Sequence, residues 1–199
     1  MRNTMMKIMI TMIISFLIAS GCNSQNNESK TTYVSDTLKC PEISYSYYFR
    51  SPHEINSYYD FDEGLECSKV SKKPYLVYFT GHLSIDARQM EAEVLSNKEI
   101  LNSIKNEFVI TTLYVDSRLI LKTEKQIISK TNGDTIKKYG LKQAYIENTK
   151  FNDKKYPAFF IMDSNGQILS GPIYFELDKN TFFEFLETGK KKYNEQNNK

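Results

Sequence analysis

The stretch YLVYFTGHLSIDARQMEAEV, residues 75–94, decides the fold class of this chain. It passes from five consecutive apolar residues, 75–79, through a short turn into an amphipathic helical pattern. An uninterrupted apolar run of this length is typical of a central strand covered on both faces. We expect the helix to begin at Ser84, because serine is a preferred N-cap and Asp86 adds a favourable negative charge near the same end. A buried strand that leads into a helix indicates a layered α/β domain.

Strand and helix signals alternate along the rest of the chain. The expected elements are an early strand over 43–49, helices over 60–71, 84–94, about 96–104 and about 135–148, strands over 75–79 and 108–115, a hairpin excursion around 119–129, an antiparallel hairpin over 157–175 and a last helix from Asp178. Asp60 with Glu63, and Ser96 with Glu99, have the spacing of capping boxes. We therefore expect Asp60 and Ser96 to be N-caps.

The composition favours one globular domain. The 199 residues are 40% apolar and 13% aromatic, which is enough to bury a core. The formal charge is +2, and Arg2 and Lys7 lie in a segment that we expect to be removed, which leaves 24 basic against 24 acidic residues. This balance gives no reason to expect a nucleic-acid partner.

The N-terminus has the features of a lipoprotein signal. Arg2 and Lys7 precede an apolar run, residues 8–19, that is too short to span a membrane comfortably, and Ala19-Ser20-Gly21-Cys22 reads as a bacterial lipobox. We predict cleavage after a signal peptide over 1–21 and acylation of Cys22. The alternative is an ordinary secretory signal in which Cys22 is incidental.

The predicted organisation follows from this signal. A flexible lipidated tether over 22–39 precedes the folded domain over 40–192, and 193–199 is a polar tail. The protein is expected in the cell envelope, outside the cytoplasm and anchored to a membrane through its lipid. Asn23 in place of aspartate after the lipidated cysteine favours the outer membrane.

Several short motifs occur in a recognisable order. They are Lys73-Pro74, Phe79-Thr80-Gly81, the set Arg88, Met90 and Glu91, then Leu113–Asp116, Tyr156-Pro157, Asp163–Gly166 and Glu184–Gly189. Their order and spacing, over roughly residues 60–192, resemble the C-terminal thioredoxin-like domain of the periplasmic thiol:disulfide interchange proteins, and bacterial lipoproteins built on that domain. The resemblance implies a thioredoxin-like α/β fold, with a central mixed sheet flanked by helices.

The same resemblance identifies what the turn lacks. Ser84 and Ala87 occupy the positions of the two redox cysteines of the family. An alcohol cannot form a disulfide, so dithiol exchange at this turn is chemically excluded. We therefore predict no catalytic residue here and no cofactor.

The resemblance also implies a peptide groove beside the turn. In the family the proline at position 157 is cis, and the residue before it pairs with an extended peptide. The candidate groove residues are His82, Ser84, Ile85, Asp86, Tyr156 and Pro157. The alternative is an ordinary trans proline that opens a strand.

The two histidines raise the alternatives of a hydrolase triad and a metal site. His82, Ser84 and Asp86 are the residue types of a hydrolase triad, but residues two apart on a tight turn rarely form the required chain of hydrogen bonds. His53, the second histidine, lies in an irregular segment and is expected at the surface. Two histidines without a neighbouring cysteine or acidic cluster predict no metal site.

The remaining cysteines, Cys40 and Cys67, favour a disulfide. A free exposed thiol is uncommon in an oxidising compartment, and a bond would clip the N-terminal extension to the domain. The alternative is that Cys67 is simply a small residue beneath that extension.

The sequence as a whole predicts a membrane-anchored binding or scaffolding module that has lost its catalytic cysteines. Its expected partners are the membrane, through the lipid, and a protein or peptide of unknown identity. The alternative function is a thiol:disulfide oxidoreductase that acts through Cys40 and Cys67 or through the thiols of a partner.

Overall fold

The computed structural model describes residues 39–41 and 55–197 of the chain, which lie in one compact unit, Leu38–Lys199. The predicted signal peptide, Cys22, the early strand over 43–49 and His53 lie outside the described residues. Among the described helices, none has the length and apolar character needed to cross a membrane.

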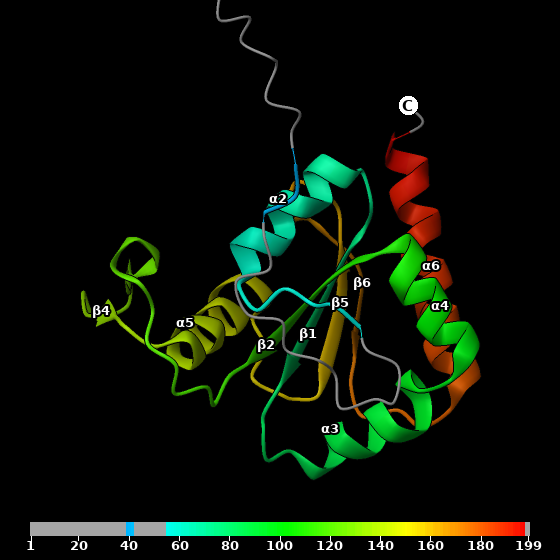
Figure 1. Cartoon of the computed structure of the whole chain (residues 1–199), viewed down its shortest axis with the longest axis horizontal. Helices are drawn as coiled ribbons and strands as arrows, with labels where there is room; N and C mark the ends of the chain where they lie inside the picture. Colours follow the sequence, from blue (N-terminus) through cyan, green and yellow to red (C-terminus); the bar gives the residue numbers. More distant parts are fainter. Residues whose placement is uncertain (1–38, 42–54, 198–199) are drawn as a thin grey trace, which may run out of the picture. The chain divides into compact units, whose positions relative to one another are not determined.

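A four-stranded mixed sheet forms the centre of the molecule, as predicted (Figure 1). Its strands are β1 (Tyr75–Thr80), β2 (Val109–Tyr114), β5 (Ala158–Met162) and β6 (Ile168–Ile173), in the order β2-β1-β5-β6. β1 runs parallel to β2 and antiparallel to β5, which forms the predicted hairpin with β6. The parallel strands β1 and β2 therefore end at the same edge of the sheet, where the chain turns from β1 into α3.

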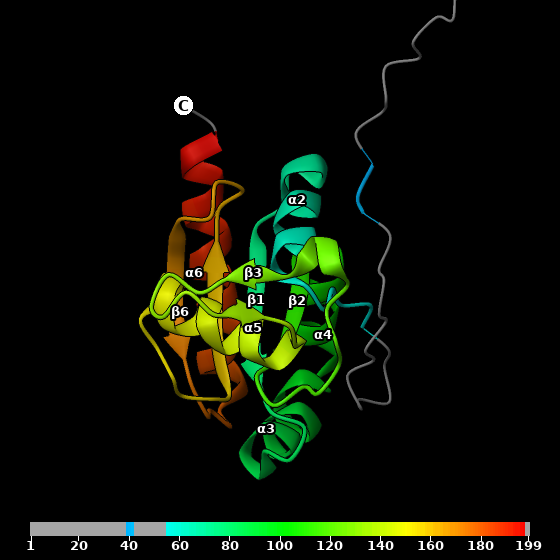
Figure 2. The same ribbon diagram turned by 90° about the vertical axis from the view of Figure 1, so that its left-hand side faces the viewer.

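Helices cover both faces of this sheet (Figures 1 and 2). The helical elements are α2 (Phe61–Ser71), α3 (Ile85–Met90), the π-helical turn η1 (Glu91–Leu95), α4 (Lys98–Glu107), the 3-10 turn η2 (Thr123–Lys125), α5 (Tyr139–Ile146), the π-helical turn η3 (Glu147–Phe151) and α6 (Lys179–Asn197). α2 and α5 pack on one face, and α4 and α6 on the other. α3 starts just beyond the end of β1.

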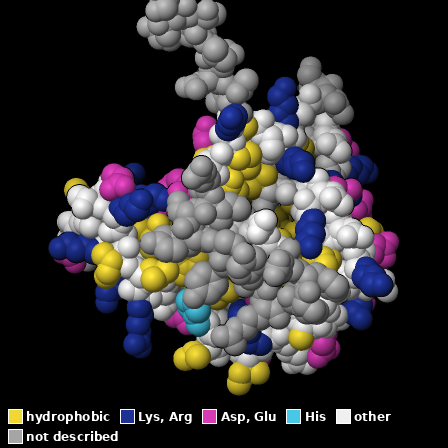
Figure 3. Space-filling view, in the orientation of Figure 1, with side chains coloured by type: hydrophobic (Ala, Val, Ile, Leu, Met, Phe, Trp, Pro, Cys, Tyr) yellow, Lys and Arg dark blue, Asp and Glu magenta, His cyan; other side chains and the backbone are white. Residues whose placement is uncertain are grey.

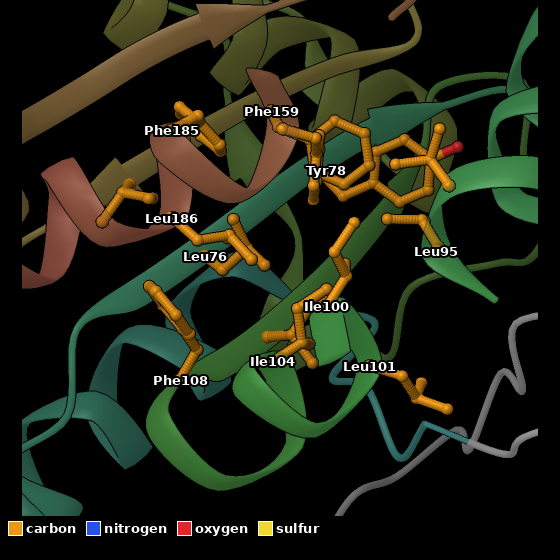
Figure 4. Close-up of a cluster of buried hydrophobic side chains, with 14 of the residues drawn as sticks. Leu76, Tyr78, Leu95, Ile100, Leu101, Ile104, Phe108, Phe159, Phe185 and Leu186 are labelled. Atoms are coloured by element: carbon orange, nitrogen blue, oxygen red, sulfur yellow. The ribbon is translucent and has the colours of Figure 1, made fainter. Parts of the chain in front are cut away.

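The alternation of side chains along β1 divides the core into two layers. Leu76 and Tyr78 point to the face covered by α4 and α6, where the Tyr78 ring stacks on Phe159 with centroids 4.0 Å apart (Figure 4). Val77 and Phe79 point to the opposite face, beneath α2 and α5. All six residues of β1 are buried, so the expectation of a central strand covered on both faces is confirmed.

The helix caps agree with the sequence only in part. Asp60 caps α2 by accepting from the Asp62 N–H at 3.0 Å, but its predicted reciprocal partner Glu63 pairs with Lys125 instead. The predicted cap at Ser96 is wrong. The Ser96 hydroxyl donates back to a carbonyl of the preceding turn, and Asn97 is the residue that caps α4.

The segment predicted as a helix over about 135–148 is partly a strand. Thr135–Ile136 is β4, which pairs antiparallel with β3 (Ile127–Ile128), so a hairpin does form in the polar excursion but extends further along the chain. Ile136 is buried against Leu121 and Tyr139, and this tertiary packing outweighs the helical pattern.

The last helix, α6, begins after Asp178 and includes Tyr193. Asp178 caps it, as predicted, through the N–H of Asn180 at 3.0 Å and the hydroxyl of Thr181. The helix continues to Asn197, past the predicted domain end at 192. Tyr193 explains the extension, because it is buried in the core and its hydroxyl lies 3.1 Å from that of Ser164.

Candidate functional site

The turn between β1 and α3 has the geometry of a helix cap. Ser84 Oγ accepts from the N–H of Ala87 at 3.3 Å, and the Ser84 carbonyl accepts from Arg88 at 3.1 Å. Ala87 is fully buried, whereas Ile85 and Asp86 are exposed. Positions 84 and 87 thus lie at the start of a helix, where the serine oxygen stabilises the backbone.

His82 pairs with an acid that the sequence analysis did not select. The Asp116 carboxylate accepts from the His82 backbone N–H at 2.9 and 3.0 Å and lies 2.8 Å from its Nδ1. Burial alone would raise the pKa of Asp116, but these hydrogen bonds outweigh it and lower the pKa. Since parallel strands end at one edge, the register Thr80 opposite Tyr114 could have located Asp116.

This pairing argues against the hydrolase alternative. The acid beside His82 is Asp116 and not Asp86, and the Ser84 hydroxyl is engaged as the cap of α3. The His82 ring stacks on Tyr114 with centroids 4.1 Å apart. The chain of hydrogen bonds from Ser84 through His82 to Asp86 that a triad would need is therefore not formed.

Pro157 lies beside the turn. The Tyr156-Pro157 bond is cis, and the register of Phe79 opposite Ala158 brings this proline to the end of β1. The Tyr156 ring passes close to Gly81, where an added Cβ would lie 3.4 Å from Cε2 of the tyrosine. Glycine at this position therefore leaves the room in which Tyr156 approaches the turn.

A surface hollow of about 440 Å³ opens between α3 and this proline. Its lining residues are Asp86, Lys154, Lys155, Tyr156, Pro157, Tyr174 and Phe175. The hollow thus unites three of the predicted groove residues. Of the other four, Lys154 and Lys155 precede β5, and Tyr174 and Phe175 follow β6. No sequence motif predicted these four residues as part of the groove.

His82 belongs to a neighbouring hollow of about 500 Å³. That hollow is lined by His82, Leu83, Asp116, Ser117, Arg118 and Leu119. His82 lines this hollow and Asp86 lines the one beside Pro157. Ser84 and Ile85 lie between these two residues in the chain. The predicted groove is therefore two adjoining hollows separated by the turn.

Large apolar side chains project into solvent around these hollows. Leu83 is 90% exposed and Ile85 is 80% exposed, while Tyr156 and Phe175 are roughly half exposed. Figure 3 shows hydrophobic side chains protruding at the lower edge of the molecule, the edge at which α3 lies in Figure 1. Exposed aliphatic groups beside concave surface are typical of a protein interaction site.

A buried polar network supports the turn from below. Arg88 donates to Glu91 at 2.7 Å and to the hydroxyl of Thr80 at 3.2 Å, and the Tyr78 hydroxyl donates to the same Glu91 oxygen at 3.0 Å. Glu91 is only 3% exposed. These contacts join α3 and η1 to β1, so the helix that follows the turn is tied to the central sheet.

Cys40 and Cys67 form a disulfide with their Cα atoms 4.4 Å apart. Cys67 lies in α2 and lines a separate hollow, whereas Cys40 is exposed. The Tyr58 hydroxyl also donates to the Pro41 carbonyl at 2.8 Å. The bond therefore attaches residues 39–41 to α2.

Among the described residues, no cluster of three histidine, cysteine or acidic side chains has the arrangement of a metal site.

Comparisons with solved structures give the following similarities. A solved structure named DsbH Oxidoreductase is similar with a TM-score of 0.52 and 16% identity, over 69% of this chain and 86% of that chain. A thioredoxin from Thermus thermophilus has a TM-score of 0.47 and 17% identity, over 66% of this chain and 84% of that chain. No curated protein matches the sequence.

A family assignment follows from the sequence itself. The profile of the thioredoxin-like domain matches residues 61–189, which is more than half of the chain. This range contains β1, the turn, α3 and Pro157, the elements from which the candidate site is built. The chain therefore belongs to the family of thioredoxin-like domains.

Proposed function

We propose that this protein binds an extended protein segment at the edge formed by the turn and Tyr156-Pro157, without performing dithiol exchange there. One observation carries the proposal: Leu83 and Ile85 expose nearly their whole side chains where the turn meets α3, beside two hollows. Burying two such aliphatic side chains against a partner would contribute on the order of 3 kcal/mol.

The chemistry of the turn supports binding over catalysis. Ser84 and Ala87 have no sulfur, and an unactivated alcohol is neither a redox group nor a nucleophile at neutral pH. The side chains that line the hollow beside Pro157 combine two tyrosines and a phenylalanine with two lysines. Such a mixture suits an extended segment that carries apolar and acidic side chains.

We further propose that the folded unit is attached to a membrane outside the cytoplasm through acylated Cys22. The lipobox at residues 19–22 supports this placement, and the disulfide suits an oxidising compartment. An anchored binding module would meet its partner in the cell envelope. The outer membrane is the expected site of attachment.

Site-directed photocrosslinking in cells tests the binding proposal. A photoreactive residue at position 85 should give a discrete crosslinked band, whereas the same residue at exposed Lys98 on α4 should not. Leu83→Ser should remove most of the band at position 85, because it deletes a neighbouring apolar contact and leaves the core intact. A band that appears equally at positions 85 and 98, or that survives Leu83→Ser unchanged, would refute a specific groove.

A second candidate function rests on the exposure of Cys40 within the disulfide. A thiolate from a partner could attack this sulfur and release Cys67, which would make the pair a dithiol couple. The reduction potential of the purified domain separates the two candidates. A value near those of glutaredoxins would favour exchange, and a value below about −300 mV would mark a structural disulfide.

A further inference from the structure

The excursion over residues 117–138, here called the arm, carries an unusual concentration of positive charge. It contains six basic residues, Arg118, Lys122, Lys125, Lys130, Lys137 and Lys138, against two acidic residues, Glu124 and Asp134. This net charge of +4 compares with +2 for the whole chain, so all other residues together carry −2. The net positive charge of the chain therefore comes from the arm.

Most of these cations face solvent. Arg118, Lys122, Lys130, Lys137 and Lys138 are exposed, and none of them forms an ion pair within the part of the chain that the structure describes. Lys125 is different, because it pairs with Glu63 and ties the arm to α2. Figure 3 shows the basic side chains gathered on the lobe at which β4 lies in Figure 1.

Exposed aliphatic side chains lie among these cations. Ile120 is 62% exposed and Ile128 is 69% exposed. Ile120 is directly opposite Lys138 in an antiparallel bridge, so the two side chains lie on the same face of that pair. A surface that presents lysines and isoleucines side by side is suited to a partner that is anionic at its surface and apolar just beneath.

The opposite, inner face of the arm packs against the rest of the domain. Leu121 and Ile136 are buried in a cluster with Tyr59, Tyr114 and Tyr139, which lie next to α2, in β2 and in α5. The arm is thus packed against the domain on its inner side. Binding through the outer side would not require the arm to become ordered first.

We propose that the outer face of the arm docks on an anionic phospholipid surface. Lysine and arginine side chains near such a surface meet the negative potential of the headgroups, and Ile120 and Ile128 can enter the boundary between headgroups and acyl chains. The proposal does not depend on the peptide groove. Acylated Cys22 would already hold the domain close to the membrane, so the arm would bind at a high effective concentration. The arm would then set the orientation of the domain on the membrane.

Vesicle co-sedimentation tests this proposal with residues 38–199, which form the compact folded unit and carry no lipid. The probes are vesicles of phosphatidylcholine alone and vesicles with about one third phosphatidylglycerol. We expect partitioning onto the anionic vesicles only, with a steep loss between about 0.1 M and about 0.5 M salt. Equal partitioning onto both kinds of vesicle, or none onto either, would overturn the proposal; the latter result would favour an acidic protein as the occupant.

Two triple variants with the same change of charge localise the effect. Lys130→Gln, Lys137→Gln and Lys138→Gln together should lower the partition coefficient by roughly a hundredfold, or about fivefold for each cation removed. Lys98→Gln, Lys105→Gln and Lys191→Gln should leave it within about twofold, because these exposed lysines lie on α4 and α6, on the opposite side of the molecule from β4 in Figure 1. Equal losses in both variants would contradict docking through the arm.

A third variant tests the apolar contribution. Ile120→Ser with Ile128→Ser should reduce partitioning onto anionic vesicles several-fold at constant salt, without altering the midpoint of urea unfolding by more than about 0.5 M, since both residues are exposed. Unchanged partitioning of this variant would overturn the part of the proposal that places these isoleucines in the headgroup boundary.

Discussion

At the scale of single residues, the turn presents a hydroxyl group at Ser84 and a methyl group at Ala87, where the family resemblance predicts two cysteine sulfurs. Ser84 caps α3 and Ala87 is buried in the first turn of the same helix, so both positions lie at the start of α3. The predicted correspondence of these two positions with the redox cysteines of the family can be tested by replacing both with cysteine.

Changing both Ser84→Cys and Ala87→Cys should create a reversible disulfide and at least weak insulin reductase activity. The helix N-terminus should lower the pKa of the new thiol at position 84 below the free value of about 8.5, although the nearby Asp86 carboxylate opposes this shift. Thiol titration and an insulin turbidity assay measure the two effects. Ser84→Cys alone is the control and should show no turnover; a folded double variant that never forms the bond would show that the assigned positions are wrong.

Glu147 is a second residue with a testable consequence. Its side chain is buried, its Oε1 atom has no hydrogen-bond partner among the described residues, and burial together with the charge of Asp153 raises its pKa to about 7. The folded state therefore holds this proton more tightly than the unfolded state, in which the pKa is near 4.5. The free energy of unfolding should fall as the pH rises from about 4.5 to about 7, and level off above.

Glu147→Gln should remove this pH dependence and increase stability at pH 8 by roughly 1 to 3 kcal/mol, because the amide never ionises. Urea unfolding at pH 5 and pH 8 provides the measurement. Glu93→Gln, an exposed acid in η1, is the matched control and should change neither value appreciably. If the wild type and Glu147→Gln have parallel stability profiles across this range, the carboxyl group is not protonated in the native state.

At the scale of secondary structure, a buried cation joins α5 to the start of α2. Lys142 Nζ lies 2.9 Å from Asp60 Oδ2 and 2.9 Å from Asp62 Oδ2, and only 5% of its side chain is exposed. Burial would lower the pKa of Lys142, but the two carboxylates outweigh it and raise the pKa. The stabilisation is therefore present at neutral pH and lost only as the pH rises above the ordinary lysine range.

Lys142→Met should destabilise the protein by about 3 kcal/mol at pH 7, because it leaves the buried Asp60 carboxylate without its counter-charge. The change in the urea midpoint measures this loss. Lys105→Met, at an exposed position of α4, should cost less than about 1 kcal/mol. Similar losses in both variants would mean that the ion pair contributes little beyond its packing.

At the scale of the whole molecule, the disulfide and the predicted lipid act on the same segment. The Cys40–Cys67 bond fixes the point at which the chain enters the fold, and Cys22 lies 18 positions before it. Cys22→Ala should abolish acylation and move the protein from the membrane to the soluble fraction. Fractionation with mass spectrometry of the N-terminus measures this. Membrane retention of Cys22→Ala that resists a high-salt wash would exclude the lipid as the anchor, whereas release by salt would point to the arm.

The sequence by itself determined the fold class, because its signals are local. The buried run of β1, the serine cap of α3 and the hairpin of β5 and β6 each depend on residues close together in the chain, and each was predicted correctly. The absence of cysteines at positions 84 and 87 is likewise a property of the sequence, and it excludes dithiol chemistry at the turn whatever the surroundings.

Only the tertiary structure decided the composition of the site. Asp116 reaches His82 because parallel strands end at one edge, and Tyr174 and Phe175 line the same hollow as Asp86 because β6 returns beside β5. The strand at 135–136 formed where a helix was expected, because Ile136 gains more from packing on Leu121 than from a local helical pattern. These outcomes depend on contacts between distant segments, and the free energy of such contacts cannot be read from local periodicity.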